Sequence, residues 1–320
     1  MPGESRRVAV LDDYQGVAAD LADWPGLGDI DVTFVREALP NEAAVVDRLT
    51  PFPILVAMRE RTAFPRSTLQ QLPNLRLLVT TGMRNASIDL RATRDLGVTV
   101  CGTGSLGHPA AELTWALILA ACRRIPQEHL SMRDGGWQTT VGVGLAGTTL
   151  GVVGLGKLGS QVARVGLAFG MDVVAWSPHL TDQRAESAGI RRVDKDQLLS
   201  TADIVTIHMV LSDRTRGLIG APELDAMKPT SLLVNTSRGP IVDQSALLDA
   251  LRSRRIAGAA LDVYDLEPLP PNHPLRTLDN VVLTPHLGYV TQENYRVFYG
   301  EALEDIAAYL RADPIRVLNA

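Results

Sequence analysis

The sequence contains little that could form a metal site, a membrane anchor or a nucleic-acid interface. Its two cysteines, Cys101 and Cys122, lie in apolar stretches and lack the spacing of metal ligands, so we expect small buried side chains. No apolar run is long enough to span a bilayer, and the N-terminus enters a strand without a signal-peptide core. The formal net charge of −5 gives no reason to expect nucleic acid or an anionic membrane as a partner. We therefore expect a cytoplasmic protein.

What is present is typical of a globular protein with a large core. Hydrophobic residues make up 46% of the 320 residues, and charged residues make up 21%. This length exceeds the usual range of a single domain, so two domains are expected.

Short apolar segments alternate with helical patterns in the N-terminal third of the chain. Strands are expected at 8–12, 32–35, 54–57, 77–80 and 98–101, and helices at 42–49, 67–72 and 88–96. Asn41 should begin the first helix and Pro73 should end the second. This alternation predicts a parallel sheet covered on both faces. Because it has no phosphate-binding glycine pattern, the segment resembles a smaller, flavodoxin-like domain.

The remainder repeats this alternation after a long apolar helix expected at 108–124 and a loop at 135–147. Beyond residue 178, strands are expected at 204–207, 232–235, 259–262 and 281–283, and helices at 196–200, 222–227 and 245–252. This pattern predicts a doubly wound sheet, whose ligands gather at the carboxyl ends of its strands. A final helix, expected at 293–310, should fold back on the first domain.

The most informative stretch is TTLGVVGLGKLGSQVARVGLAFGMDVVAWSP, residues 148–178. An expected strand at 150–153 precedes a G-x-G-x-x-G turn, a helix at 157–167 and a second strand at 173–176. The flanking elements favour a dinucleotide site, with a methyltransferase of related fold as the alternative.

Each glycine of this turn has a physical reason. Gly154 permits the tight turn, Gly156 lets the backbone approach a pyrophosphate, and Gly159 lets helix and strand pack closely. The pyrophosphate would rest on the helix N-terminus at Lys157 and Leu158, where free N–H groups and the helix dipole favour negative charge.

Three polar residues follow expected strands in the second half, namely Arg238, Glu267 and His286. The guanidinium of Arg238 can bind a carboxylate and polarise an adjacent carbonyl. His286 can exchange a proton near neutral pH, and Glu267 would favour its protonated form and fix its orientation. Together these side chains could serve the carbonyl that accepts a hydride, although each residue alone could also be structural.

These stretches resemble the D-isomer-specific 2-hydroxyacid dehydrogenases. The similarity is carried by ELTWALILAACRR, GTTLGVVGLGKLGSQVA, NTSRGPIVD, ALDVYDLEP and LTPHLG, and more weakly by TTGMRNASID. The resemblance implies a Rossmann cofactor domain at 103–288 and a split, flavodoxin-like substrate domain at 1–102 plus 289–320. It also implies an active site between these doubly wound domains and a homodimer held by the cofactor domains.

The resemblance also implies roles for individual residues. Arg238 would bind the substrate, Glu267 would pair with histidine, and His286 would be the acid/base. The backbone around Met83 and Arg84 would hold the substrate carboxylate. The expected cofactor contacts are Gly154, Gly156, Lys157, Leu158, Gly159, His208, Thr236, Ser237, Asp262 and Gly288, with Asp262 at the nicotinamide carboxamide.

The chain departs from NAD-dependent relatives after the second Rossmann strand. Those relatives carry an acidic residue that holds the ribose hydroxyls, whereas this chain has Ser177 there. Without a carboxylate a 2′-phosphate is not repelled, and Ser177, His179 or Arg184 could contact it. We therefore favour NADP over NAD, with a turn-capping Ser177 and indifferent cofactor use as the alternative.

A second departure lies in the substrate loop, where Arg84 replaces a common glycine. Its side chain could attract a second anionic or polar group of the substrate, or it could point to solvent. The pocket wall is expected from Met58–Arg59 and Met83–Asn85, with Tyr289 or Tyr295 as further candidates. These residues do not select one acid.

The leading prediction is a nicotinamide-dependent oxidoreductase that reduces a 2-oxo acid and oxidises a D-2-hydroxy acid. An alternative of the same class is reduction of a 2-imino acid to an amino acid, because a protonated imine also accepts a hydride. A non-enzymatic dinucleotide sensor is the alternative from another class, and the complete Arg238, Glu267 and His286 set argues against it.

Overall fold

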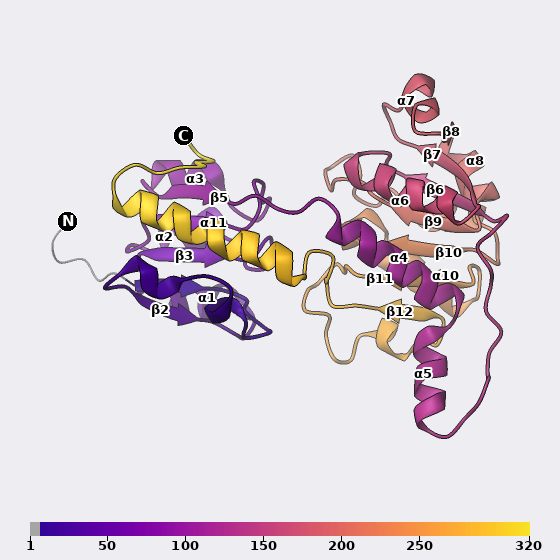
Figure 1. Ribbon diagram of the computed structural model, residues 1–320, viewed down its shortest axis with the longest axis horizontal. Helices are drawn as coiled ribbons and strands as arrows, with labels where there is room; N and C mark the ends of the chain where they lie inside the picture. The colour runs from indigo at the N-terminus through magenta and orange to yellow at the C-terminus, as the bar shows by residue number, and fades with distance from the viewer. Residues whose placement is uncertain (1–6) are drawn as a thin grey trace. The chain divides into compact units, whose positions relative to one another are not determined.

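The computed structural model describes residues 7–320, and the chain divides into two compact units (Figure 1). The first unit consists of Met1–Leu106 with Thr291–Ala320, and the second consists of Gly107–Val290. Both have parallel sheets, which confirms the predicted fold class of two doubly wound α/β domains. Among the described helices, none combines the length and apolar character needed to cross a bilayer.

The described part of the first unit contains a five-stranded parallel sheet in the order β2-β1-β3-β4-β5. Its strands are β1 Arg7–Val10, β2 Asp31–Phe34, β3 Ile54–Ala57, β4 Leu77–Thr80 and β5 Thr99–Gly102. Its helices are α1 Glu42–Leu49, α2 Arg66–Gln70, α3 Leu90–Asp95 and α11 Gln292–Leu310, with 3-10 turns at Ala18–Asp20 and Trp24–Leu27. This strand order is that of flavodoxin-like domains, as the sequence predicted.

The local sequence accounts for the two longest helices of this unit. Asn41 begins α1 as predicted, and its side chain accepts a hydrogen bond from the Ala44 N–H at 2.9 Å. Helix α11 has buried apolar side chains every three or four residues, at Tyr295, Phe298, Tyr299, Ala302 and Ile306. The chain leaves this unit after β5 and returns to it through α11.

The second unit, all of whose residues are described, has a seven-stranded parallel sheet in the order β12-β11-β10-β9-β6-β7-β8. Its strands are β6 Thr149–Val153, β7 Asp172–Trp176, β8 Arg191–Arg192, β9 Ile204–Ile207, β10 Leu232–Asn235, β11 Gly258–Leu261 and β12 Val281–Leu283. Counted from its own first strand, the sheet follows the Rossmann order with one additional edge strand. The order therefore reverses between β6 and β9.

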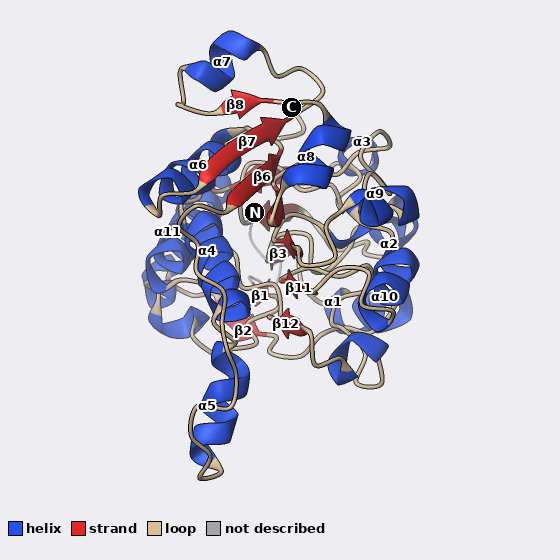
Figure 2. Ribbon diagram, turned by 90° about the vertical axis from the view of Figure 1, so that its right-hand side faces the viewer, coloured by secondary structure: helices blue, strands red, loops and turns tan. Residues whose placement is uncertain are grey.

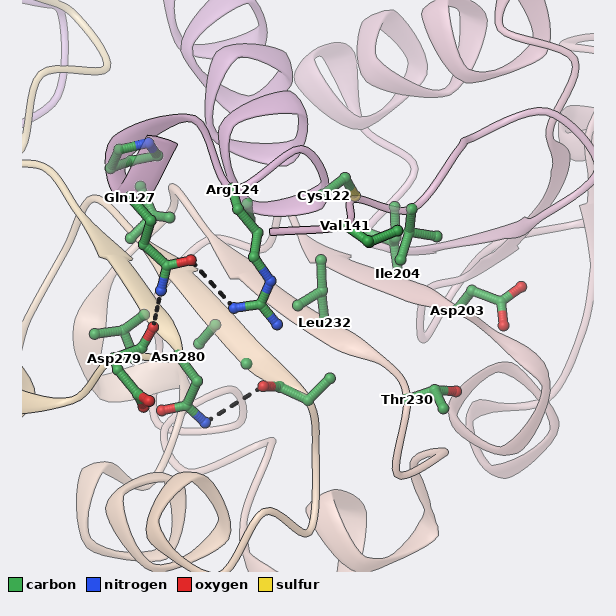
Figure 3. A pocket seen from close by; sticks show the side chains of 18 of the residues that line it. Cys122, Arg124, Gln127, Val141, Asp203, Ile204, Thr230, Leu232, Asp279 and Asn280 are labelled. Atoms are coloured by element: carbon green, nitrogen blue, oxygen red, sulfur yellow. Dashed lines mark hydrogen bonds between the residues drawn. The ribbon is translucent and has the colours of Figure 1, made fainter. Parts of the chain in front are cut away.

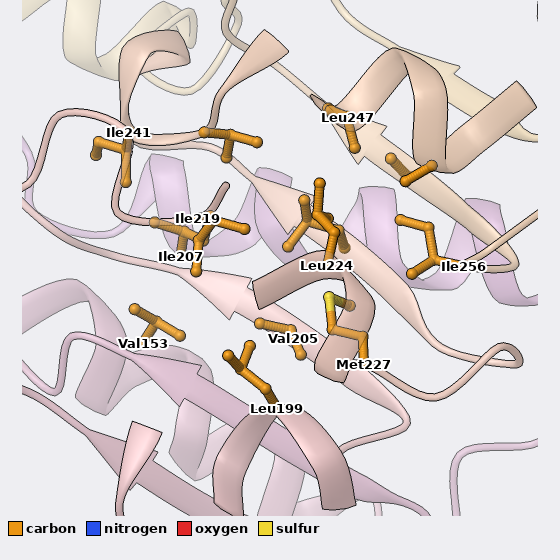
Figure 4. Close-up of a cluster of buried hydrophobic side chains, with 14 of the residues drawn as sticks. Val153, Leu199, Val205, Ile207, Ile219, Leu224, Met227, Ile241, Leu247 and Ile256 are labelled. Carbon is orange, nitrogen blue, oxygen red and sulfur yellow. The ribbon is translucent and has the colours of Figure 1, made fainter. Parts of the chain in front are cut away.

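Helices cover both faces of this second sheet, with α4 and α6 on one side and α8, α9 and α10 on the other (Figure 2). The helices are α4 Pro109–Cys122, α5 Ile125–Arg133, α6 Lys157–Ala168, α7 Asp182–Glu186, α8 Lys195–Thr201, α9 Ala221–Ala226 and α10 Gln244–Arg252, with 3-10 turns at Gly239–Ile241 and Pro274–Thr277. Figure 4 shows the core beneath α8, α9 and α10, where Leu199, Leu224 and Leu247 meet Val205 and Ile207 of β9. This packing fixes the strands whose ends carry the candidate site.

Two α-helices and one strand of the second unit were not predicted. Helix α5 begins directly after α4, because Arg124 adopts a left-handed conformation with φ +49° and turns the chain. Helix α7 has five residues, and β8 is a two-residue edge strand of exposed arginines. Such short polar elements lack the periodicity from which the other strands and helices were predicted.

Candidate active site

The polar residues singled out in the second unit lie at one edge of its sheet. Because the strands are parallel, their carboxyl ends share this edge. His208 follows β9, Arg238 follows β10, Glu267 lies beyond β11, and His286 follows β12. The glycine turn follows β6, so it lies beside β9 at the point where the strand order reverses. Open α/β sheets bind their ligands at such a point.

The glycine turn leaves room for an anion. Gly154 has φ +103°, and a Cβ atom there would lie 2.6 Å from the carbonyl oxygen of His208. A Cβ atom on Gly159 would lie 2.0 Å from the Gly154 carbonyl oxygen, so α6 approaches the turn more closely than alanine permits. A Cβ atom on Gly156 would have no neighbour within 4 Å. Open space at the N-terminus of α6 fits a dinucleotide pyrophosphate.

The turn after β7 is tied to the glycine turn through Ser177. The Ser177 hydroxyl accepts a hydrogen bond from the Leu155 N–H at 2.8 Å. His179 and Arg184 are exposed, and the carboxylate of Asp182 pairs with Arg192 at 3.1 Å. The Ser177 hydroxyl oxygen therefore holds the glycine turn as an acceptor, and its own O–H group can still donate a hydrogen bond. Contact of these residues with a 2′-phosphate stays a prediction.

His286 and Glu267 form a hydrogen-bonded pair. Nδ1 of His286 lies 2.5 Å from Oε2 of Glu267, and both side chains are largely buried. The other carboxylate oxygen, Oε1, accepts a hydrogen bond from the Tyr264 N–H at 2.9 Å, which fixes the carboxylate. His286 itself has a left-handed backbone with φ +55°, a conformation that costs a non-glycine residue roughly 1–2 kcal/mol. The pair is therefore held by the surrounding turns and is suited to proton transfer.

Asp262 holds the turn that carries His286. Its side chain is fully buried, and Oδ1 accepts hydrogen bonds from the Thr284 hydroxyl at 2.6 Å and the Leu287 N–H at 2.7 Å. Oδ2 accepts a hydrogen bond from the Gly288 N–H at 2.9 Å. Burial raises the pKa of this carboxyl, and the donors oppose that effect. The predicted contacts of Asp262 with the nicotinamide and of Gly288 with the cofactor stay predictions, whereas the anchoring of the turn is observed.

Arg238 belongs to a turn packed against the Tyr264–Glu267 turn. A Cβ atom on the next residue, Gly239, would lie 2.1 Å from the Tyr264 carbonyl carbon, so only glycine permits this approach. Arg238 donates from Nη1 to the Ser237 carbonyl at 2.7 Å, and the Asn235 side chain donates to the Arg238 carbonyl at 3.0 Å. The turn that holds Arg238 thus lies beside the turn that holds the His286 partner.

Neighbouring hydroxyls fix the start of the Arg238 turn. The Thr236 hydroxyl lies 2.8 Å from that of Thr114 on α4, and the Ser237 hydroxyl donates to the Ile207 carbonyl at 2.7 Å. These contacts connect the carboxyl ends of β9 and β10 with α4. The predicted contacts of Thr236 and Ser237 with the cofactor stay predictions.

His208 lies at the end of β9, beside the glycine turn. Desolvation lowers the pKa of its imidazole to about 4, and Nε2 lies 2.9 Å from the Thr206 hydroxyl. The imidazole is therefore neutral near pH 7 and adds no positive charge beside the glycine turn. Its predicted cofactor contact stays a prediction.

In the first unit, the loop after β4 offers two backbone donors. The Gly82 N–H donates to the Thr103 hydroxyl at 2.9 Å, so this amide is engaged within the unit. Across the described residues, the N–H groups of Met83 and Arg84 donate to no other group, and both residues are exposed. This arrangement fits the predicted carboxylate-binding loop with Met83 and Arg84 as its donors.

Sequence reasoning did not predict how these loops are held. The Thr81 hydroxyl accepts a hydrogen bond from the Arg59 N–H at 2.9 Å, and the Asp262 carboxylate accepts one from the Leu287 N–H at 2.7 Å. Arg59 was named only as part of the pocket wall. Arg59 lies two residues beyond the carboxyl end of β3, and parallel sheets bind ligands at that edge. This position could have identified Arg59 as a candidate site residue.

A cavity lies at the opposite, amino edge of the second sheet (Figure 3). It measures about 510 Å³ and lies beside α5 and the amino ends of β9 to β12. Its wall is mainly apolar, with Cys122, Val141, Ile204 and Leu232, and Arg124 hydrogen-bonds Gln127 at 3.3 Å within it. Because the candidate acid/base pair lies at the carboxyl edge, this cavity is not the catalytic site.

The second unit thus combines a Rossmann sheet, an anion-accepting glycine turn and a histidine–carboxylate pair at one edge. These features define a nicotinamide-dependent oxidoreductase domain. Residues 115–288 match the family model described as the D-isomer specific 2-hydroxyacid dehydrogenase, NAD binding domain. The chain belongs to the D-isomer-specific 2-hydroxyacid dehydrogenase family, as the resemblance predicted. Its members are NAD-dependent oxidoreductases that act on the CH–OH group of 2-hydroxyacids.

Several relatives support this assignment. Glyoxylate reductase of Aeropyrum pernix is 42% identical over 251 residues, covering 75% of this chain and 75% of that protein. D-3-phosphoglycerate dehydrogenase of Archaeoglobus fulgidus is 38% identical over 264 residues, covering 82% of this chain and 50% of that protein. The chain therefore spans about half the length of that dehydrogenase. A phosphoglycerate oxidoreductase structure from Vibrio cholerae is 38% identical with a TM-score of 0.92, covering 96% of this chain and 99% of that chain.

Proposed function

We propose that this protein reduces 2-oxo acids with a nicotinamide dinucleotide and oxidises D-2-hydroxy acids in the reverse direction. The observation that carries this proposal is the His286–Glu267 pair at the sheet edge that also carries the glycine turn. The family membership and the names of the relatives support it over imine reduction and over a sensor.

The residues at this edge have distinct roles. Glu267 accepts the Nδ1–H of His286, which leaves Nε2 as the atom that exchanges a proton with the substrate oxygen. Arg238 binds the substrate carboxylate and polarises the carbonyl to be reduced. A bound nicotinamide dinucleotide supplies the hydride to C2 of the substrate. In the reverse direction, neutral His286 takes the proton from the hydroxyl group.

The first unit binds the same substrate through its backbone. The N–H groups of Met83 and Arg84 donate to the C1 carboxylate, while Gly82 shapes the loop with φ +90°. Two amides in a turn can bind an anion without a charged side chain. The proposed substrate domain is the split segment at 1–102 plus 289–320, and the cofactor domain is 103–288.

The preferred cofactor in this proposal is NADP. Support comes from the turn after β7, where Ser177 stands in place of the carboxylate that holds the ribose hydroxyls in NAD-dependent relatives. Such a carboxylate would repel a 2′-phosphate, whereas this turn has the exposed His179 and Arg184 after Ser177. Asp182, the next carboxylate along the chain, is paired with Arg192. The described turn therefore offers donors and cations to a phosphate.

The protein is further proposed to act as a homodimer. Helix α5 and the segment after it expose large apolar side chains, with 62% of Leu130, 73% of Trp137 and 92% of Val141 accessible. The 510 Å³ apolar cavity adjoins this surface, so one face offers both protruding side chains and a recess, as an isologous interface requires. Sedimentation should give a dimer for the wild type and a monomer for L130D/V141D.

The test is oxidation of NADPH and NADH, side by side, with small and bulky 2-oxo acids. We expect turnover of at least one acid and a higher kcat/KM with NADPH. Turnover that requires ammonium would replace 2-oxo acid reduction by imine reduction. Tight cofactor binding without turnover of any acid would favour the sensor.

A further inference from the structure

Tyr264 contacts each of the three turns that carry the candidate catalytic residues. It lies three residues beyond the carboxyl end of β11, and it is only 7% exposed. Its backbone N–H, its carbonyl group and its phenol hydroxyl each meet a different turn. A buried polar side chain with such contacts is a candidate for a role beyond core packing.

The backbone of Tyr264 holds Glu267. The Tyr264 N–H donates to Oε1 of Glu267 at 2.9 Å, while the opposite oxygen, Oε2, lies 2.5 Å from Nδ1 of His286. Because the first contact restricts rotation of the carboxylate, it determines where Oε2 points. The same backbone meets the Arg238 turn, since a Cβ atom on Gly239 would lie 2.2 Å from the Tyr264 carbonyl oxygen.

The phenol hydroxyl of Tyr264 connects the ends of β11 and β12. It lies 2.8 Å from the Thr284 carbonyl oxygen and 3.1 Å from the Leu261 carbonyl oxygen, so two acceptors share its single proton. Leu261 is the last residue of β11, and Thr284 directly follows β12. The Thr284 carbonyl also accepts the His286 N–H at 3.1 Å, so the phenol holds the carbonyl from which the His286 turn begins.

This phenol remains a donor at the pH values where an acid/base histidine works. Burial raises the pKa of the Tyr264 phenol above its usual value, and the nearby carboxylates of Asp262 and Glu267 raise it further. The charge of Arg276 opposes this effect without reversing it. The hydrogen bonds of the phenol therefore persist while the histidine changes its protonation state.

His286 is thus held on both sides of its turn. Before it, the Tyr264 phenol binds the Thr284 carbonyl, and after it the buried Asp262 carboxylate accepts hydrogen bonds from the next two N–H groups. The left-handed backbone of His286, with φ +55°, persists only where such contacts determine it. A hydrogen bond between a carboxylate and an imidazolium depends strongly on distance and direction. The alignment of the pair therefore depends on how the ends of β11 and β12 are held together.

We propose that Tyr264 is a positioning residue for the proton transfer that accompanies reduction, and that its phenol hydroxyl and backbone N–H together align Glu267 with His286. The proposal deepens the proposed function and rests on it, because Tyr264 acts only through the acid/base pair. Since the role depends on the hydroxyl and not on the packing of the ring, removal of the hydroxyl alone should reveal it.

The first variant is Y264F, which keeps the buried ring. It should fold, because both carbonyls keep a donor. The Thr284 N–H binds the Leu261 carbonyl at 2.9 Å, and the His286 N–H binds the Thr284 carbonyl at 3.1 Å. We expect the single-turnover rate of reduction at saturating 2-oxo acid to fall about fivefold or more, while KM and dinucleotide affinity stay within about twofold of the wild type.

The pH profile of this rate separates positioning from a structural role. Reduction requires protonated His286, so the rate falls as the pH rises through the midpoint of the profile. A weaker contact with Glu267 stabilises the imidazolium less, so the midpoint in Y264F should move to lower pH by about 0.5 units or more. Asp262, the other carboxylate near His286, keeps its donors in this variant.

A double variant tests whether Tyr264 acts through the pair. In an E267Q background the pair is already broken, so adding Y264F should lower the rate by less than about twofold. Y299F is the matched control, because Tyr299 is a buried tyrosine of the first unit whose ring contacts Trp24. Y299F should leave the rate, KM and the midpoint unchanged.

Two kinetic results would overturn the proposal. One is a rate and a midpoint in Y264F equal to those of the wild type. The other is a loss of rate that is equally large with and without E267Q, because it would assign the hydroxyl to the structure of the unit alone.

If no acid is reduced, the proposed function fails, and the role of Tyr264 is tested by NMR titration of the His286 imidazole. Its signal is assigned in histidine-labelled protein by its loss in H286Q. The proposal requires the titration midpoint in Y264F to lie below that of the wild type by about 0.5 pH units or more. Equal midpoints in the two proteins would overturn the proposal independently of catalysis.

Discussion

The two sheets share an architecture but differ at the turn after their first central strand. After β6 the chain has Gly154 with φ +103° and open space beside Gly156. After β1 it has Asp12 with φ +58° and then the buried Asp13. One Asp13 oxygen accepts hydrogen bonds from the Val17 N–H at 2.9 Å and the Ala18 N–H at 3.1 Å.

The difference shows how equivalent sheet positions acquire different ligands. In the first unit a carboxylate of the chain itself occupies the backbone donors that follow β1, so a phosphate would meet a buried anion. In the second unit glycines leave the corresponding donors open, so an external anion can bind. Strand order alone therefore does not determine the ligand.

The largest expected effect concerns Gly159, which packs against the glycine turn of the second unit. In G159A the added Cβ would lie 2.0 Å from the Gly154 carbonyl oxygen, so helix α6 must move. We expect dinucleotide affinity to fall by more than about 100-fold and the free energy of unfolding to fall by ~1–3 kcal/mol. Calorimetric titration with NADPH and NADH, with chemical denaturation, would measure both.

G156A is the matched control, because its Cβ would have no neighbour within 4 Å. Its stability should stay within about 0.5 kcal/mol of the wild type, while dinucleotide affinity falls about tenfold or more. Unchanged affinity in both variants would contradict the placement of the pyrophosphate at this turn.

The next effect concerns the pair at the same edge. In E267Q the neutral amide cannot stabilise a protonated His286 and can turn its own N–H₂ group toward Nδ1. We expect kcat to fall by about 10²-fold or more while cofactor affinity stays within about twofold. Steady-state kinetics and NADPH titration would check this, and an undiminished kcat would remove Glu267 from the mechanism.

A smaller effect should follow from the turn after β7. S177D supplies the carboxylate that NAD-dependent relatives have, and this carboxylate can still accept the Leu155 N–H. The ratio of kcat/KM with NADPH to that with NADH should fall about tenfold or more, because the 2′-phosphate would be repelled. S187A, in an exposed turn beyond α7, is the control and should keep the ratio. A ratio that S177D leaves unchanged would place the 2′-phosphate elsewhere.

The smallest effect contrasts the pH dependence of the two units. In the first unit, burial raises the pKa of Asp305 to about 7 despite Arg316 at 2.9 Å. Between about pH 4 and about 7, the folded state keeps a proton that the unfolded state releases. The contribution of Asp305 to the free energy of unfolding therefore falls as the pH rises over this range. In the second unit, burial lowers the pKa of His208 to about 4, so the unfolded state binds a proton that the folded state does not. The contribution of His208 to the free energy of unfolding therefore rises between about pH 4 and 6.5.

Denaturation of the wild type, D305N and H208Q between pH 4.5 and 7.5 measures these contributions. As the pH rises, the free energy of unfolding of D305N should increase by ~1–2 kcal/mol relative to that of the wild type, and that of H208Q should decrease by a similar amount. These values are discounted for solvent screening and for the charge of Arg316. Parallel curves of the free energy of unfolding against pH for all three proteins would contradict the pKa shifts of both Asp305 and His208.

Much of the fold could be predicted from the sequence, because buried parallel strands are short apolar runs. Every strand except β8 was predicted within two residues, and the Asn41 cap was predicted correctly. The His286–Glu267 pair could also be anticipated, since both residues follow strands whose carboxyl ends meet at one edge.

The rest depends on tertiary contacts that have no local pattern. The left-handed conformations of Arg59 and Arg124 do not follow from their residue type, and no local pattern predicts the three donors to the Asp262 carboxylate. Likewise, the engagement of the Gly82 amide by Thr103 depends on a residue 21 positions away. Such contacts arise only once the strands are packed.

The central claim is that His286 gives the proton while a dinucleotide gives the hydride. The most direct measurement is single-turnover reduction of the best 2-oxo acid with NADPH or NADH deuterated at the transferring C4 position, in wild type and H286Q. We predict one deuterium at C2 of a D-2-hydroxy acid, and a rate in H286Q lowered by about 10²–10⁴-fold with cofactor affinity nearly unchanged. A product without deuterium at C2, or an equal rate in H286Q, would contradict the account.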